Sequence, residues 1–363
     1  MRILHVETGR HLYGGPQQVV WLLGGLAQRA VDSALVCMPG SDVDRSARTA
    51  GIRVYNVPCA GDLDLSFAWW LGRVIRWESP DLVHCHSRRG ADLLGGLAAR
   101  VAGVPAVLSR RVDHPEPGIV AGFRYRPFRK VIAISENVAA SLRDSGLARH
   151  RMTVIRSAVD YRRFEMNVDP VEFRRQFGLA PDAIVIAAAG QLIPRKGHRY
   201  LLEAMAGLVR SHPNIVLLVF GQGELAAELE DQAMKLELGR HVQFAGFRED
   251  LDDYLAAVEL LVHPALREGL GVAMLKAQAA GVPVVAFDVA GSREAVAHDR
   301  TGILVRPKDS RALEQAIARL LGDPAMRRRL GETARERMRN EFSIEGMVDQ
   351  HLAVYEAALD EPR

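Results

Sequence analysis

The sequence predicts an α/β protein made of two doubly wound domains, each built around a parallel sheet. Short apolar runs, which are typical of buried strands, alternate with helical patterns along nearly the whole chain. The alternation restarts after a polar, irregular stretch at residues 162–170, which is typical of a linker between domains. The chain has 363 residues, more than one hydrophobic core usually supports.

The first half of the chain opens with an apolar run at residues 3–6 and a glycine-bearing loop at residues 9–16, which lead into a helix expected at residues 17–29. A strand, a glycine turn and a helix in this order are the usual opening of a doubly wound domain. Further strands are expected at 34–38, 54–58, 81–86, 106–109, 131–134 and 153–156, and further helices at 67–77, 90–102 and 136–145.

The second half repeats the alternation with a strand at residues 183–189, a loop at 190–197 and a helix that runs to residue 211. The next strands are expected at 215–220, 242–247, 260–264 and 282–287. Helices are expected after Glu224, from Asp252 onward, and between the last two strands. Amphipathic patterns predict three closing helices at 310–322, 324–341 and 343–359.

Composition narrows the classes of function. A hydrophobic content of 48% is that of a globular protein, and a formal net charge of +3 is too small to indicate nucleic-acid binding. The three cysteines lack metal-type spacing and indicate a reducing compartment. No signal-peptide layout or membrane-length apolar run is present, so we expect a cytoplasmic protein that at most rests on a membrane surface.

The most informative stretch follows the apolar run at residues 260–264. Gly269 and Gly271 stand where a helix should begin, and a glycine-bearing loop between a parallel strand and a helix is an anion-binding device, because backbone N–H groups and the helix dipole point at it. Glu268 stands at its mouth, where a carboxylate can accept hydrogen bonds from sugar hydroxyls. The alternative is an ordinary carboxylate that is stabilised by the start of the helix.

The loop at residues 190–197 carries the adjacent cations Arg195 and Lys196 between a strand and a helix. An arginine binds phosphate as a fork and a lysine as a point charge, so the pair suits a pyrophosphate. The alternative is a basic turn that faces solvent.

These motifs resemble those of glycosyltransferase family GT4, whose members have the GT-B fold. The run Glu268-Gly269-Leu270-Gly271 is similar to the start of the family's acidic signature. The family places a second Glu eight positions after the first, but here that position is Lys276, which cannot accept the bonds that the usual Glu takes from ribose hydroxyls. Gln191 likewise replaces the family's first loop arginine, and Arg195 is its expected substitute.

The resemblance covers nearly the whole chain and implies two Rossmann-like domains that face each other across a cleft, with the last helix crossing back. It implies an acceptor-side domain at residues 1–163 with 344–363 and a donor-binding domain at 164–343. It gives catalytic roles to four residues: Arg195, Lys196, Glu268 and His114. It gives donor binding to nine: Gly14, Gly15, Gln191, Gly221, Phe247, Gly269, Leu270, Gly271 and Lys276. The alternative for Phe247 is that it is an aromatic residue of the core. The alternative for His114 is that it is a histidine in a surface loop.

The function that the resemblance implies is retaining transfer of a sugar from a UDP- or GDP-type donor to a hydroxyl of a glycan or a lipid-linked, lipopolysaccharide-type acceptor. No cofactor and no metal are expected, because nothing around Asp62-Leu63-Asp64 resembles the metal-binding loop of the other common transferase fold. Three alternatives stay open: a sugar-nucleotide epimerase, a phosphorylase, or a relative whose catalysis is impaired by Lys276. A two-lobed binding protein is disfavoured because such proteins are usually exported.

Three further patterns have competing interpretations. His84 and His86 form a His-x-His at a strand end; because successive side chains alternate along a strand, we expect the two not to share a metal ion, and we expect His86 to line the cleft. The segment from Phe123 to Lys130 mixes aromatic rings with four cations, so it either contacts anionic lipid or is a connection with its rings tucked under the next strand. The tryptophans at 69, 70 and 77 either pack internally or face lipid.

Overall fold

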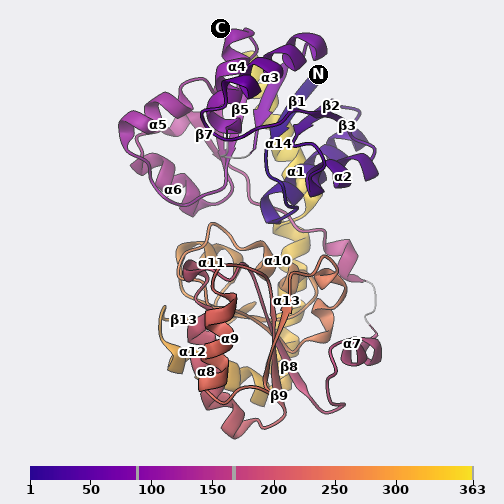
Figure 1. Ribbon diagram of the computed structural model, residues 1–363, viewed down its shortest axis with the longest axis vertical. Coiled ribbons are helices and arrows are strands. Elements are labelled where there is room, and N and C mark those ends of the chain that lie inside the picture. The colour runs from indigo at the N-terminus through magenta and orange to yellow at the C-terminus, as the bar shows by residue number, and fades with distance from the viewer. Residues whose placement is uncertain (87–89, 166–168, 362–363) are drawn as a thin grey trace. The chain divides into compact units, whose positions relative to one another are not determined.

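The computed structural model describes residues 1–86, 90–165 and 169–361. The chain divides into two compact units, one formed by Met1–Ala158 with Ile344–Arg363 and the other by Val159–Ser343. Each unit is an α/β domain built around one parallel sheet (Figure 1), and each is described by itself.

The first unit holds a seven-stranded parallel sheet in the order β3-β2-β1-β4-β5-β6-β7. The strands are β1 (Arg2–Glu7), β2 (Asp32–Cys37), β3 (Arg53–Asn56), β4 (Leu82–Cys85), β5 (Ala106–Arg110), β6 (Lys130–Ala133) and β7 (Met152–Val154). The strand order reverses between β1 and β4. In open α/β sheets, ligands bind outside the carboxyl ends of the strands at such a switch point.

Helices cover this sheet: α1 (Gly14–Gln28), α2 (Asp42–Thr49), α3 (Leu65–Glu78), α4 (Gly96–Val101), α5 (Gly118–Tyr125) and α6 (Glu136–Asp144). A π-helical turn at Ala91–Gly95 leads directly into α4. The last helix, α14 (Ile344–Asp360), returns to this unit and packs on α1. The two helices are so close that a Cβ added at Gly25 of α1 would lie 2.5 Å from a methyl group of Val348. The predicted return of the last helix is therefore confirmed.

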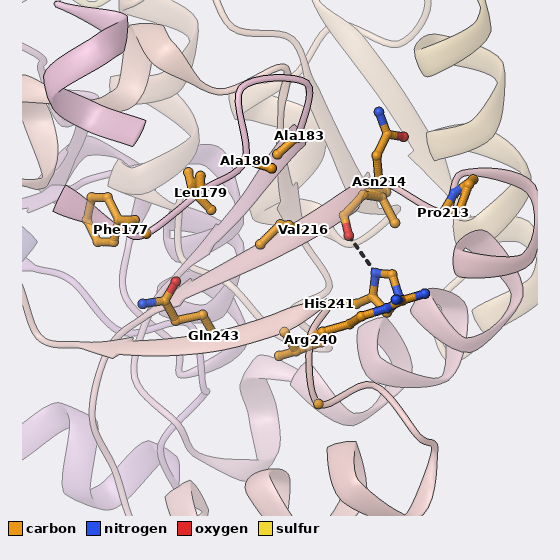
Figure 2. A pocket seen from close by; sticks show the side chains of 14 residues that line it. Phe177, Leu179, Ala180, Ala183, Pro213, Asn214, Val216, Arg240, His241 and Gln243 are labelled. Atoms are coloured by element: carbon orange, nitrogen blue, oxygen red, sulfur yellow. Dashed lines mark hydrogen bonds between the residues drawn. The ribbon is translucent and has the colours of Figure 1, made fainter. Parts of the chain in front are cut away.

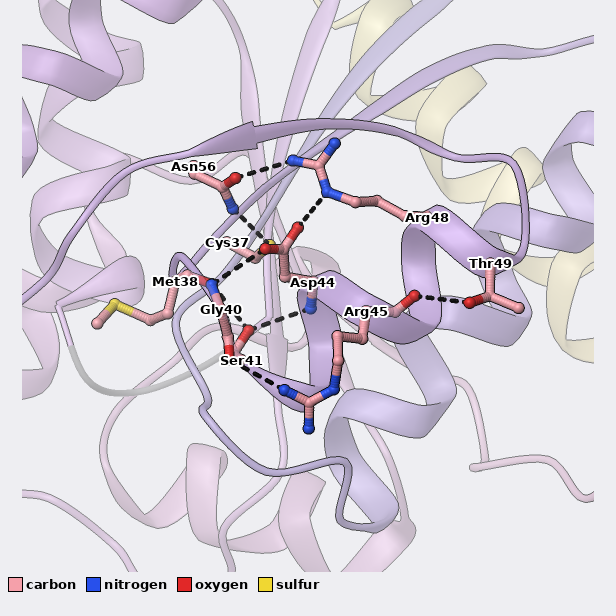
Figure 3. A network of polar contacts seen from close by, with 9 residues as sticks. All are labelled: Cys37, Met38, Gly40, Ser41, Asp44, Arg45, Arg48, Thr49 and Asn56. Atoms are coloured by element: carbon pink, nitrogen blue, oxygen red, sulfur yellow. Dashed lines mark hydrogen bonds and ion pairs between the residues drawn. The ribbon is translucent and has the colours of Figure 1, made fainter.

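Four helices were not expected from the sequence: α2, α5, α7 (Pro170–Gln176) and α11 (Ala290–Ala295). Hydrogen bonds of side chains stabilise α2 (Figure 3): the Ser41 hydroxyl accepts from the Asp44 N–H at 3.1 Å, and the Asp44 carboxylate accepts from Arg48 Nε at 2.7 Å. A stretch of eight residues with only two apolar residues that face the core, Val43 and Ala47, is too short a pattern to reveal a helix. The helix α1 begins at Gly14, so Gly14 and Gly15 form its first turn and not the predicted loop.

The second unit holds a six-stranded parallel sheet in the order β10-β9-β8-β11-β12-β13. The strands are β8 (Ile184–Ala189), β9 (Ile215–Phe220), β10 (Val242–Gly246), β11 (Leu260–His263), β12 (Val284–Phe287) and β13 (Gly302–Val305). The strand order reverses between β8 and β11, so the loops after these two strands start at the switch point.

The helices of the second unit are α7, α8 (His198–Ser211), α9 (Ala226–Lys235), α10 (Val272–Ala279), α11 (Ala290–Ala295), α12 (Ser310–Gly322) and α13 (Pro324–Glu341). They bury one hydrophobic cluster on each face of the sheet. The helix expected from Asp252 is instead two 3-10 turns, Leu251–Asp253 and Leu255–Ala257. Within the described part of the chain, no helix combines the length and the apolar character that crossing a bilayer requires.

Candidate active site

Two loops of the second unit bring Lys196 and Glu268 together at the carboxyl edge of the sheet. Lys196 ends the 3-10 turn Pro194–Lys196 that follows β8, and Glu268 lies in the loop between β11 and α10. The ammonium of Lys196 donates a hydrogen bond to Glu268 Oε2. His263 Nε2 lies 2.9 Å from the same oxygen, and the Gly269 N–H donates to Oε1 at 3.2 Å. The Glu268 carboxylate is thus held from three sides.

The charges of this cluster are fixed by its surroundings. Burial by itself would raise the pKa of Glu268, but the charge of Lys196 and the hydrogen bond from His263 outweigh it and hold the pKa well below its usual range. Burial lowers the pKa of His263, and the cation at Lys196 lowers it further, against the opposite effect of Glu268. Glu268 is therefore ionised and His263 is neutral at neutral pH. His263, at the end of a buried strand, was not recognised in the sequence as part of the site.

Four of the helices that start at this edge lack a side-chain cap in the described part of the chain. No side chain accepts a hydrogen bond at the N-caps of α8, α9, α10 and α11, which follow β8, β9, β11 and β12. The N-terminus of α12, which follows β13 and so starts at the same edge, is capped by Asp309, and the N-terminus of α13 is capped by Asp323. The uncapped N-termini concentrate N–H donors and positive dipole ends at one edge of the sheet, which favours an anionic ligand there.

Two glycines allow the loops of this edge to pack in direct contact. Gly197 has φ +66°, and a Cβ there would lie 2.1 Å from the Pro264 carbonyl oxygen; the neighbouring Leu266 N–H donates to the Arg195 carbonyl at 2.8 Å. A Cβ at Gly291, in the first turn of α11, would lie 2.2 Å from the Glu268 carbonyl oxygen. The loops after β8, β11 and β12 therefore meet around Glu268.

Arg195 is exposed next to this cluster. No ion pair is formed by its guanidinium within the described ranges, and its charge contributes to the lowered pKa of His263. Gln191 is half-buried, and its carbonyl oxygen lies 3.2 Å from His198 Nε2. The β8–α8 loop thus offers one exposed cation, Arg195, and one that is engaged with Glu268.

Lys276 projects from α10 and pairs with Asp252, whose Oδ2 lies 2.9 Å from Lys276 Nζ. Arg163 Nη1 lies 3.8 Å from the same carboxylate oxygen, and Asp252 is buried. The position where the family usually has a carboxylate therefore carries a cation, and a carboxylate from another loop lies against it. No pattern in the sequence predicts this pairing, because the sequence places Asp252 at the start of a helix.

The other donor-binding candidates of this unit occupy different settings. Gly221 directly follows β9, with φ +153°, and packs against the Gly190 carbonyl, and Gly271 is the N-cap of α10. Phe247 follows β10 and is 43% exposed, so its alternative interpretation as a core residue is wrong. Leu270 is buried in the hydrophobic core, so only its backbone remains available to a ligand.

The remaining candidates lie in the first unit, at the carboxyl edge of its sheet. A Cβ at Gly15 would lie 3.2 Å from Arg111 Cδ, and Arg111 directly follows β5. His114 is half-buried in the β5–α5 connection, and its carbonyl oxygen lies 3.5 Å from Arg110 Nη2. The first turn of α1 therefore lies against the segment that carries His114.

The expectation for His84 and His86 is wrong in its geometry. Residues two apart on a strand share a face, and the two rings lie with centroids 3.7 Å apart. Both are buried: His86 Nε2 lies 2.9 Å from His5 Nδ1, and His84 contacts Tyr355 and Ser109 at 2.7 and 2.8 Å. His86 thus belongs to the core of its unit and lines no surface. The three rings come within ligand distance of one another, but these hydrogen bonds and the nearby charge of Arg111 favour a neutral network over a cation.

The segment from Phe123 to Lys130 divides into buried and exposed parts. Tyr125 and Phe128 are buried, as in the interpretation that its rings pack under the next strand. Arg124 is buried against Asp92, and Arg129 donates to carbonyl groups near the end of α14. These contacts leave few of its side chains for a lipid surface, with Phe123 exposed at the end of α5.

Asp62 and Asp64 have structural roles. Asp62 accepts from the Gly90 N–H at 2.7 Å, and Asp64 caps α3 through the N–H groups of Ser66 and Phe67.

A cavity of about 600 Å³ lies elsewhere in the second unit, between Phe177, Asn214, His241 and Gln243 (Figure 2). It lies at the amino ends of β8, β9 and β10, opposite the edge that carries Glu268, so it is not the site described above.

Comparisons with known proteins agree with this architecture. Residues 13–163 match the model of Glycosyltransferase Family 4, and residues 171–337 match that of Glycosyl transferases group 1. The chain is 27% identical to the lipopolysaccharide core biosynthesis glycosyltransferase LpsE of Rhizobium meliloti, over 97% of this chain and 98% of that protein. It is 24% identical to the Escherichia coli UDP-Gal:alpha-D-GlcNAc-diphosphoundecaprenol alpha-1,3-galactosyltransferase, over 78% and 77%. The fold is similar to that of Anabaena Alr3699/HepE in complex with UDP and glucose, with a TM-score of 0.89 at 20% identity, over 98% of this chain and 100% of that one.

Proposed function

The chain belongs to the GT-B glycosyltransferases of family GT4, which act on nucleotide sugars, and from this membership we propose that it is a retaining, metal-independent transferase. It would move a hexose or similar sugar from a UDP- or GDP-type donor to a hydroxyl group. The acceptor would be a glycan or a lipid-linked, lipopolysaccharide-type molecule. The names of two relatives, one for lipopolysaccharide core biosynthesis and one for a diphosphoundecaprenol acceptor, support this class.

The observation that carries the proposal is the Lys196–Glu268–His263 cluster beside the uncapped N-termini of α8 and α10. A donor diphosphate brings negative charge that suits Lys196, the exposed Arg195 and the first-turn N–H groups. When Lys196 turns to the diphosphate, Glu268 stays ionised and is still held by His263 and the Gly269 N–H. Its carboxylate is then available to accept hydrogen bonds from hydroxyl groups of the sugar.

The chemical step follows from this placement of charge. Cleavage of the bond between the sugar and the diphosphate leaves negative charge on the leaving phosphate, and preorganised cations and N–H groups stabilise that charge as it develops. We assign no general base to the protein. The departing phosphate would take the proton of the acceptor hydroxyl as the new glycosidic bond forms on the same face of the sugar.

The decisive experiment measures nucleotide release from a panel of UDP- and GDP-sugars, with and without acceptor, for the native chain and for Lys196→Ala. Loss of one stabilising donor typically costs roughly 10²–10³ in rate, and we expect a loss of that size for Lys196→Ala. Lys235→Ala, an exposed lysine on α9, is the matched control and should keep native turnover. Near-native turnover of a folded Lys196→Ala protein would refute the assignment. Product anomers determined by NMR test retention separately.

A further inference from the structure

The outer face of α3 is unusual for a helix on the surface of a protein. Its exposed positions recur every three to four residues and carry Leu65, Ser66, Trp69, Trp70, Arg73, Arg76 and Trp77. Trp77 is 82% exposed, Trp69 54% and Trp70 47%. Isolated apolar side chains on a surface are normal, but three tryptophans on one helical face mark an interaction site.

The charged residues of this face are all cations. The guanidinium of Arg73 lies over the rings of both Trp69 and Trp70, 5.1 and 5.3 Å from their centroids, and Arg76 is exposed in the last turn of the helix. The one carboxylate of the helix, Glu78, is buried. We call the face formed by Leu65, Trp69, Trp70, Arg73, Arg76 and Trp77 the tryptophan face.

We propose that the tryptophan face docks this protein on the surface of an anionic lipid bilayer. Tryptophan rings, with an apolar body and one N–H donor, are favoured at the boundary between headgroups and acyl chains. Arginines beside them attract anionic headgroups while their stems cover apolar surface. An aromatic and aliphatic face with cations and no exposed carboxylate has the composition of a helix that lies in a membrane interface.

Exposed apolar side chains continue beside α3, although Asp62, in the turn before the helix, is an exposed carboxylate. Leu63, in the turn before α3, is exposed, and α4, which packs beside α3, exposes Leu97 and Val101 on either side of Arg100. In contrast, the segment from Phe123 to Lys130, the sequence-based candidate for lipid contact, buries Tyr125 and Phe128. Ile119, Val120 and Phe123 are also exposed on α5, but that helix has no tryptophan and buries its one cation, Arg124, so we place the docking surface on α3. This inference is independent of the proposed sugar transfer, because no residue of the tryptophan face belongs to the candidate active site.

The protein's own fluorescence provides the test, since three of its four tryptophans lie on this face and the fourth, Trp21, packs against the core. Vesicles of phosphatidylcholine with phosphatidylglycerol should shift the emission to the blue, and brominated lipids should quench it. Trp69→Ser/Trp70→Ser/Trp77→Ser should reduce co-sedimentation with these vesicles more than tenfold. Arg73→Gln/Arg76→Gln should weaken it by about fivefold for each arginine, and only with anionic lipid.

Phe123→Ser, at an exposed aromatic residue of α5, is the matched control and should bind vesicles as the native chain does. Nucleotide release with a water-soluble acceptor should be unchanged in all these variants, which separates this test from that of the transferase. The proposal is overturned if anionic vesicles cause no blue shift, if the triple variant still sediments with them, or if Phe123→Ser removes binding instead. A change of sedimentation coefficient in the triple variant without lipid would assign the face to contacts between copies of the chain.

Discussion

Lys276 Nζ lies 2.9 Å from Asp252 Oδ2, and this ion pair occupies the position at which the GT4 motif has its second glutamate. The carboxylate is buried and the lysine is partly exposed. The pair shows that the departure from the family motif is accommodated by a partner that lies 24 positions earlier in the chain.

Lys276→Glu should destabilise the protein, although it restores the family's usual residue. The new carboxylate would face Asp252, and the loss of one partner of a mostly buried pair leaves a buried charge, at a cost of roughly 3 kcal/mol in the free energy of unfolding. Lys276→Glu/Asp252→Asn should recover much of this loss. Urea titrations of the single and double variants provide the measurement.

The rate of nucleotide release by the Lys276→Glu variant, measured with several donors, reports on catalysis. A higher rate than that of the native chain would indicate that Lys276 impairs the native enzyme. A changed donor preference would indicate that Lys276 selects the nucleotide.

Glu268→Gln should lower kcat/KM by roughly 10²-fold, because an ionised acceptor is replaced by a neutral amide while Lys196 loses its partner. The side chain keeps its shape, so the variant should still fold. The measurement is nucleotide release, normalised to the folded fraction by circular dichroism. Glu249→Gln, in the loop after β10, serves as the comparison and should retain native activity. A fully active Glu268→Gln would show that the carboxylate is only a helix-start residue.

Gly197→Ala should disrupt the site through its backbone. The residue has φ +66°, and a Cβ would lie 2.1 Å from the Pro264 carbonyl oxygen, so the loops after β8 and β11 must separate. We expect a loss of more than 1 kcal/mol in stability and a fall in turnover at least tenfold larger than for Gly239→Ala, where no atom lies within 4 Å of the added Cβ. Equal behaviour of the two variants would contradict the close packing of these loops.

Stability should decrease as the pH falls below about 6.5, the ordinary pKa of histidine. Burial lowers the pKa of His5 to about 3 and of His351 to about 4, and it lowers those of His84 and His86 as well. The unfolded chain then binds more protons than the folded one, so stability is complete above pH 6.5 and is lost towards pH 4, by up to about 1.4 kcal/mol per pH unit for each histidine. Thermal unfolding between pH 8 and 5 measures the slope. His351→Gln should make it shallower, whereas His150→Gln, at an exposed site, should not change it.

Transferase activity should persist in a chelator. Asp62 and Asp64 accept hydrogen bonds from backbone N–H groups of their own unit, so their carboxylates have a structural role that does not involve a metal ion. Nucleotide release should differ by less than twofold between excess EDTA and added Mg²⁺ or Mn²⁺. Activity that vanishes in EDTA and returns with one of these ions would refute metal independence.

Local sequence patterns determined most of the strands and the long amphipathic helices. Buried strands such as β8 and β11 are continuous apolar runs because both of their faces are covered. Such runs can be recognised in the sequence without knowing which strands pair with them. Helix α2 was missed because it is short and has only two buried apolar residues, Val43 and Ala47, beside the cap at Ser41 and the ion pair between Asp44 and Arg48. The His84 and His86 rings, by contrast, could have been placed on one face from strand geometry alone.

By itself the sequence determined which loops follow which strands, and so which residues stand at the carboxyl edge of each sheet, since that order is a property of local periodicity. Only the tertiary structure decided what those residues contact. Lys196 and Glu268 lie 72 positions apart, and Lys276 and Asp252 lie in different elements. Their pairing depends on the crossover connections of the sheet, which no local pattern encodes. The exposure of the three α3 tryptophans is of the same kind, because a helical period fixes which residues share a face but not which face is covered.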